Sequence, residues 1–216
     1  IFFTTHKCAS KFFHQFFLDI AKHNNLIKFN FDEFKLRYKK YYLSDIYYEF
    51  ANEVGCIYAP IRRYEKFENI CKYKVILALR DPRDTLVSYY FSTLYSHDTN
   101  SLNFIQHREK FKNRDVDSFV ISNSDWLLTT LESYRQNLKN FHFINYEDLT
   151  LYPESTIKSL LEYLSVNISE TKFKLSYKVK SCIKPPYCGT RPNLNFVKRS
   201  LIGSFVDFVP SINISP

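Results

Sequence analysis

Apolar residues occur along this chain in short unbroken runs that alternate with longer stretches of helical spacing. The run 75–79 contains no polar residue, which is typical of a strand buried on both faces. Further short, mostly apolar runs are found at 1–4, 55–59 and 141–145. Each of these four runs is therefore predicted to be a strand.

The longer stretches predict helices between the strands. One begins at Ser10, and its apolar stripe is Phe12, Phe13, Phe16, Phe17 and Ile20. Another follows Arg80, with Asp81 suited to the N-cap and Pro82 to the first helical position. The residues at helical spacing there are Leu86, Val87, Tyr90, Phe91 and Leu94. Further helices are expected over 118–138 and from Pro153 onward, where Ile157, Leu160, Leu161 and Leu164 form the stripe.

Three segments are less regular. Residues 31–50 are expected to be helical or mixed, 98–116 form a polar stretch, and the tail from 171 onward lacks any rhythm. The alternation elsewhere predicts an α/β fold, a three-layer sandwich with a mainly parallel central sheet flanked by helices. Ligands of such folds bind at the carboxyl ends of the strands. Lys7, Tyr58, Arg80 and Tyr146 all lie at or just beyond such ends.

Composition, charge and cysteine content restrict the classes of protein to which this chain can belong. The 216 residues are 45% hydrophobic, enough for one core, and we expect a single domain over 1–216. The net charge of +8 favours anionic ligands, but the charge is spread along the chain and lacks the clustered stripe of a nucleic-acid binder. The five cysteines are too sparse for a disulfide scaffold, and no zinc-site spacing is present. The sequence leaves open whether Cys182 and Cys188 pair.

The first residues of the chain do not show to which compartment the protein is targeted. The chain begins at Ile1 and contains no Met, so we expect it to be N-terminally incomplete. No run reaches the roughly 18 apolar residues that span a bilayer. We expect a cytoplasmic location, or the Golgi lumen if an N-terminal anchor has been removed.

Four motifs, in order, resemble those of the sulfotransferases that use 3′-phosphoadenosine 5′-phosphosulfate (PAPS). The segment 5–12, Thr-His-Lys-Cys-Ala-Ser-Lys-Phe, resembles the family's 5′-phosphosulfate loop, Pro-Lys-Ser-Gly-Thr-Thr-Trp. The segment 79–90 resembles its 3′-phosphate segment, and 145–149 matches the Tyr-Glu-Asp-Leu signature. The segment 198–205 is similar to a C-terminal loop, Arg-Lys-Gly-x-x-Gly-Asp-Trp, that closes over the 3′-phosphate.

The resemblance implies a P-loop-like sulfotransferase domain that binds PAPS, releases the bisphosphate PAP and needs no metal. It implies that Lys7 is catalytic and that Ser10 and Arg80 bind the 5′- and 3′-phosphates. The remaining donor-binding residues that it implies are Cys8, Ala9, Lys11, Phe12, Ser88, Tyr146, Lys198, Arg199 and Ser200. Ala9 stands where the family has Gly, Lys11 where it has Thr, and Phe12 where it has Trp. Phe12 is expected to stack on adenine, and Tyr146 is expected to lie near it. Ser200 replaces the closing Gly.

The residue that accepts the acceptor's proton is not evident. Where the family's small-acceptor branch has His, this chain has Tyr58, whose ordinary pKa of about 10 makes it a poor base. We predict His97 as the catalytic base, with His14 and Glu53 as the other candidates.

Other functions compete with this hypothesis. The substitution at Tyr58 and the altered loop allow a PAP- or PAPS-binding module without catalysis. A P-loop kinase is disfavoured because Gly-x-x-x-x-Gly-Lys-Ser/Thr is absent. The expected partner is a small-molecule or glycan acceptor and not a nucleic acid, with its pocket formed from segments 24–52 and 92–116.

Overall fold

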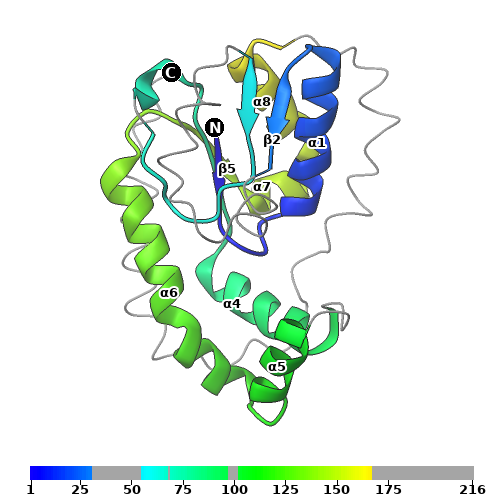
Figure 1. Cartoon of the computed structure of the whole chain (residues 1–216), viewed down its shortest axis with the longest axis vertical. Coiled ribbons are helices and arrows are strands. Elements are labelled where there is room, and N and C mark those ends of the chain that lie inside the picture. Colours follow the sequence, from blue (N-terminus) through cyan, green and yellow to red (C-terminus); the bar gives the residue numbers. More distant parts are fainter. Residues whose placement is uncertain (31–54, 68, 97–101, 167–216) are drawn as a thin grey trace. The chain divides into compact units, whose positions relative to one another are not determined.

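The structure is a computed structural model of the chain (Figure 1). The residues that it describes are 1–30, 55–67, 69–96 and 102–166. Contacts divide these residues into two compact units, one formed by those of Ile1–Leu79 with 140–166 and the other by those of Arg80–Lys139. The prediction of one domain is not tested by this division. The expectations for 31–50 and for the tail from 171 onward lie outside the described residues.

The first unit is built on a parallel sheet of three strands. The order is β1 (Phe2–Thr4), β4 (Ile76–Leu79) and β5 (His142–Asn145). All four residues of β4 are buried, as the unbroken apolar run predicts for a central parallel strand. The α/β class and the parallel sheet flanked by helices are thereby confirmed.

A fourth segment of chain lies along the other side of β1. Ile61 forms a parallel bridge with Phe3. The Thr4 amide donates to the Ile61 carbonyl at 2.9 Å, and the Ile61 amide donates to the Phe2 carbonyl at 2.9 Å. The backbone of β1 is therefore paired on both sides, and residue 62 follows at the end where β1 finishes.

The first unit also contains a second, two-stranded parallel sheet. Its strands are β2 (Ile27–Phe29) and β3 (Cys56–Tyr58), and Figure 1 shows β2 beside α1 (Ser10–His23). The strand predicted at 55–59 is confirmed as β3. The sequence did not reveal β2, because it is only three residues long and its Ile27 is exposed. A short 3-10 helix, η1 (Ile70–Lys72), precedes β4.

Helices pack their apolar stripes against the three-stranded sheet. The predicted apolar stripe of α1 is buried. The centroid of the Phe2 ring lies 4.6 Å from that of the Phe13 ring and 5.0 Å from that of the Phe17 ring. The helices α7 (Tyr146–Leu151) and α8 (Pro153–Leu164) bury Leu149, Ile157 and Leu160 in the same core. Burying a large apolar side chain contributes about 1.5–3 kcal/mol, so this aromatic-rich core is a main source of stability.

The second unit is helical. It consists of α4 (Pro82–Phe91), a π-helical turn η2 (Ser92–Ser96), α5 (Leu102–Phe111) and α6 (Val116–Asn137). The helix predicted over 118–138 is confirmed, and Asp115 caps it by accepting from the Ser118 amide at 2.7 Å. The polar stretch 98–116 was not expected to contain a helix, but α5 forms there. Among the residues of α5 whose burial is described, 105–111, Phe111 joins the small core with Leu94 and Phe119.

Candidate functional site

The strands of the main sheet end at one edge because all of its pairs are parallel. The residues that follow β1, β4 and β5 directly are Thr5, Arg80 and Tyr146. Each of these residues lies within the first two positions of one of the three described motifs. The edge expected to bind the ligand is therefore the edge from which the motifs begin.

The loop from Thr5 to Ala9 joins β1 to α1 in a closed conformation. Thr5 and Cys8 are buried, and Thr5 Oγ1 lies 2.9 Å from Cys8 Sγ. Cys8 Sγ also donates to the His6 carbonyl at 3.7 Å. Lys7 is partly buried and has φ = 67°, and Ala9 has φ = 53°. Two left-handed residues therefore turn the chain into α1, one of them at the position where the family has glycine.

The N-terminus of α1 has an open cap. Ala9 is the N-cap residue and offers no side-chain hydrogen bond, and no acidic residue stands in the first turn. The first amides of a helix have no acceptor inside it, and the helix dipole favours an anion at this end. The arrangement suits a phosphate or sulfate group beside Ser10, the first residue of the helix.

A residue that the sequence analysis did not single out contacts Ser10. Nη2 of Arg62 donates to Ser10 Oγ at 3.3 Å. The available signal was the Arg62–Arg63 pair shortly after Pro60. The pair alone does not indicate a contact with Ser10, because that contact depends on the pairing of Ile61 with β1, and sequence spacing does not predict this pairing.

Tyr146 begins α7 directly after β5. Asn145 caps this helix by accepting from the Glu147 amide at 3.3 Å. Tyr146 is only 6% exposed and belongs to the core of the first unit. The strand predicted at 141–145 is confirmed as β5, while a contact of Tyr146 with adenine stays a prediction.

The start of α4 is fixed by a capping interaction. Asp81 accepts from the Arg83 amide at 2.8 Å and from Arg83 Nε at 2.9 Å, and Pro82 occupies the first turn. Burial alone raises the pKa of Asp81, but the hydrogen bonds and charge of Arg83 outweigh it and hold that pKa below its ordinary value. Arg83 is therefore engaged with the cap, and the sequence prediction of Asp81 as N-cap is confirmed.

Arg80 and Ser88 belong to the same segment of the second unit. The Arg80 side chain is 8% exposed, and its Nη2 lies 3.9 Å from Asp84 Oδ2. A guanidinium presents a planar fork of donors, a geometry that suits carboxylate and phosphate groups. Ser88 lies in α4, two turns from its start, and is partly buried.

Two of the proposed donor-binding side chains have surroundings that the resemblance did not imply. The Phe12 ring is 3% exposed and stacks on Phe16 at 6.1 Å within the core. Phe12 is thus part of the buried stripe of α1, and its stacking on adenine stays a prediction. Lys11 is exposed.

The candidates for the base differ in their surroundings. Tyr58 is 2% exposed and packs among the rings of Phe29, Phe67 and Tyr73. Lys28 Nζ lies 3.1 Å from His14 Nδ1, and since an ammonium only donates, this nitrogen accepts the hydrogen bond. His97 and Glu53 lie outside the described residues.

Other predicted features are also outside the described part of the chain. These are the tail residues Lys198, Arg199 and Ser200 and the pair Cys182 and Cys188. Within the described ranges, no group of three or more His, Cys, Asp or Glu side chains is arranged to hold a metal ion. None of the helices described is long and apolar enough to cross a membrane.

Comparison with known proteins gives a family and a fold. The family model described as "Sulfotransferase domain" matches residues 66–184, which is more than half of the chain. This range includes Arg80, Ser88 and Tyr146, whereas Lys7 precedes it. No curated protein sequence matches the chain.

A solved structure of mouse sulfotransferase SULT7A1 complexed with PAP is similar to the structure described above. The TM-score is 0.52, the sequence identity is 14%, and the match covers 98% of this chain and 83% of the mouse chain. At this identity the likeness shows the fold alone.

Proposed function

This chain belongs to the sulfotransferase family, and we propose that it transfers a sulfuryl group from PAPS to a hydroxyl or amine acceptor. The observation that carries the proposal is the loop between β1 and α1. Its two left-handed residues turn the chain so that a lysine precedes an uncapped helix N-terminus with Ser10 at its first position. A site of this kind suits the 5′-phosphosulfate of the donor.

In this proposal the loop between β1 and α1 binds the 5′ end of the donor. The backbone amides of Cys8, Ala9, Ser10, Lys11 and Phe12 provide donors, and the Ser10 hydroxyl binds the 5′-phosphate. The Lys7 ammonium neutralises charge that develops on the oxygen between phosphorus and sulfur. The residues present fit such an anion because neither the cap nor the first turn of α1 contributes a carboxylate.

The 3′-phosphate is assigned to the segment after β4. Arg80 offers a planar fork of donors and Ser88 a hydroxyl. The family resemblance adds Lys198, Arg199 and Ser200 from the tail, and it places Tyr146 near the adenine. The mouse structure was solved with PAP, which supports adenosine 3′,5′-bisphosphate as the probe for this site.

The proposed reaction is an in-line transfer. A bond forms between sulfur and the acceptor oxygen or nitrogen as the bond from sulfur to the 5′-phosphate oxygen breaks. The acceptor proton passes to a base, for which His97 is the first candidate, and the negative charge of the broken bond stays on the released phosphate. The transfer needs no oxidant or reductant.

The test is substitution of the loop lysine. We expect Lys7→Ala to lower transfer of labelled sulfate to an acceptor panel by about 10²-fold or more, because it removes a charge aimed at the leaving oxygen. Lys22→Ala, exposed in the last turn of α1, is the matched control. Thermal unfolding with adenosine 3′,5′-bisphosphate and with ATP tests nucleotide selection. Stabilisation by ATP alone would refute the proposal in favour of a kinase.

A binding module without catalysis is the second candidate. It is favoured by Tyr58, which stands at the family's base position and is buried among aromatic rings. Binding of the bisphosphate without transfer to any acceptor of a panel of phenols, alcohols, amines and glycans would support this alternative. Transfer of labelled sulfate to an acceptor, lost in Lys7→Ala, would exclude a binding module without catalysis.

A further inference from the structure

We infer that Arg62 is a donor-binding residue that contacts the 5′-phosphate of the sulfuryl donor beside Ser10. This inference rests on the proposed function, since it assigns a further residue to the same ligand. It comes from a contact between two segments that are 52 residues apart in sequence.

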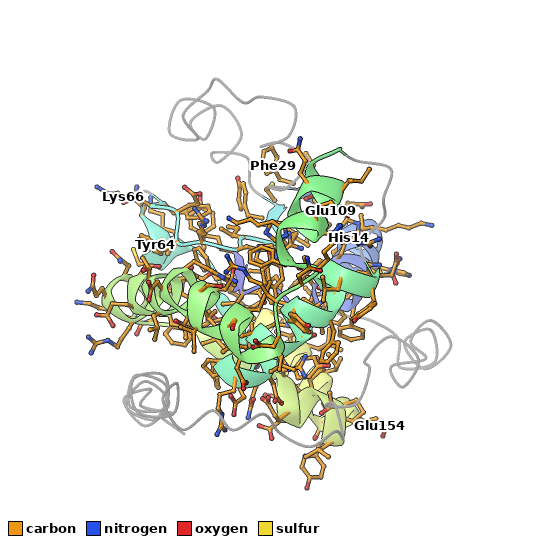
Figure 2. All side chains as sticks on the ribbon, turned by 90° about the horizontal axis from the view of Figure 1, so that it is seen from below. His14, Phe29, Tyr64, Lys66, Glu109 and Glu154 are labelled. Carbon is orange, nitrogen blue, oxygen red and sulfur yellow. The ribbon has the colours of Figure 1, made fainter. Side chains whose placement is uncertain are left out.

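The backbone position of Arg62 is set by the edge of the main sheet. Ile61 pairs with Phe3 in the parallel direction, and two hydrogen bonds of 2.9 Å hold it to Phe2 and Thr4. Parallel chains progress toward the same edge, so Arg62 leaves the pairing where β1 runs into the loop of Lys7. The same packing is anchored by Tyr64, labelled in Figure 2, whose ring stacks on Phe3 at 5.9 Å.

The side chain of Arg62 reaches the first residue of α1. Its Nη2 donates to Ser10 Oγ at 3.3 Å in a partly buried setting. A hydroxyl that accepts from a guanidinium keeps its own O–H as a donor for another group. A guanidinium has five N–H donors in a planar fork, so it can hold Ser10 and an anion oxygen together.

The charge of the donor explains why a second cation is useful here. A 5′-phosphosulfate carries negative charge on both its phosphate and its sulfate, and the charge on the phosphate increases when sulfur leaves. Lys7 alone offers a compact point charge in the loop. Arg62 adds a guanidinium next to Ser10, where the phosphate is proposed to lie, and charge-assisted bonds of this type are among the stronger hydrogen bonds.

The experiment compares two ligands that differ only at the 5′ position. Affinities of adenosine 3′,5′-bisphosphate and adenosine 3′-monophosphate are measured by calorimetry for wild type, Arg62→Gln and Arg63→Gln. We expect Arg62→Gln to weaken the bisphosphate by about 10- to 100-fold and the monophosphate by less than about twofold. Arg63, the exposed neighbour, is the matched control, and its variant should bind both ligands as wild type does.

The outcomes separate this inference from the proposed function. Wild-type affinity of Arg62→Gln for the bisphosphate, or an equal loss for both ligands, would overturn the role of Arg62 while leaving the donor site intact. Failure of wild type itself to bind the bisphosphate would refute the proposed function and this inference with it.

Two further variants separate direct contact from an effect through Ser10 or through folding. In a Ser10→Ala background, Arg62→Gln should still weaken the bisphosphate about 10-fold, and loss of that effect would contradict direct contact. If Arg62→Gln does not fold, Arg62→Lys keeps the charge without the fork. We expect it to weaken the bisphosphate selectively by about threefold to tenfold, and unchanged binding would overturn the inference.

Discussion

Lys7 and Ala9 adopt left-handed backbone conformations although neither is glycine. Their φ angles are 67° and 53°. For a residue with a Cβ this conformation costs about 1–2 kcal/mol, because Cβ approaches the following carbonyl oxygen. The loop therefore retains local strain at the position where the proposed ligand binds, a common feature of functional sites.

The strain predicts that glycine stabilises one position of the loop. We expect Ala9→Gly to raise the free energy of unfolding by about 0.5–1 kcal/mol, since relief of strain exceeds the extra entropy of the unfolded chain. Ala21→Gly, a buried position within α1, should have the opposite sign and lower it by about 1 kcal/mol or more. Urea unfolding of both variants measures the difference, and destabilisation by Ala9→Gly would contradict the prediction.

Part of the candidate site could be predicted from the sequence. Lys7 and Arg80 were singled out because each lies at or just beyond the end of a predicted strand, and the family resemblance added Ser10, which opens a predicted helix. Arg62 was not, since its contact with Ser10 depends on a bridge between Ile61 and Phe3. Phe12 was assigned to adenine from its place in the motif, but the same residue also belongs to the buried stripe of α1, and that role determines its packing.

At the scale of elements, α4 depends on its first turn. Asp81 accepts from the amide and the guanidinium of Arg83, and Pro82 follows it. The cap keeps the start of the helix in place directly after Arg80. Loss of the cap should therefore affect the segment proposed to bind the 3′-phosphate as well as stability.

The cap predicts a pH-dependent contribution to stability. At pH 7 we expect Asp81→Ala to lower the free energy of unfolding by about 1–2 kcal/mol. Asp81→Asn should lower it less, because asparagine still caps but lacks the charge that pairs with Arg83. The folded pKa of Asp81 lies below its unfolded value, so the charge stabilises above about pH 3.9 and this stabilisation is lost as pH falls through the folded pKa.

Unfolding curves of wild type and Asp81→Asn between pH 7 and pH 3 measure this effect. The difference between the two proteins should shrink at the acidic end. Asp125→Asn, at an exposed position of α6, serves as the control for loss of a charge. A difference that stays constant down to pH 3 would show that the Asp81 charge contributes nothing.

The elements that the sequence predicted share a strong local signal. The structure confirms the strands predicted at 75–79 and 141–145, which are short runs of mostly apolar residues. It also confirms the helices predicted from Ser10 and Pro153, which have long apolar stripes. β2 and α5 lack that signal. β2 exists because Lys28 and its neighbours pair with β3, and α5 packs Phe111 into the core of its unit. Tertiary contacts therefore decide elements whose own pattern is weak.

At the scale of the whole molecule, contacts between distant segments hold the first unit together. The Tyr163 hydroxyl of α8 accepts from the Val75 amide at 3.1 Å and donates to the Val75 carbonyl at 3.1 Å. The Tyr163 ring also stacks on His142 at 4.9 Å. These contacts join α8 to the starts of β4 and β5, at the edge of the sheet opposite the proposed site.

These contacts predict a stability effect without a functional one. We expect Tyr163→Phe to lower the free energy of unfolding by about 1–2 kcal/mol, because the Val75 amide loses its acceptor. Affinity for adenosine 3′,5′-bisphosphate should remain unchanged. Tyr152→Phe, at an exposed tyrosine, should alter neither quantity. Equal stability of wild type and Tyr163→Phe in chemical unfolding would show that water replaces the hydroxyl without cost.

The left-handed turn at Ala9 also bears on how related chains can be recognised. A motif written in residue types that requires glycine at this position rejects the present sequence. A description of the loop in backbone dihedrals does not depend on the residue type there, because Ala9 adopts the left-handed conformation that glycine adopts easily. In a chain with three glycines in 216 residues, the conformation of the loop therefore carries information that a motif based on glycine omits.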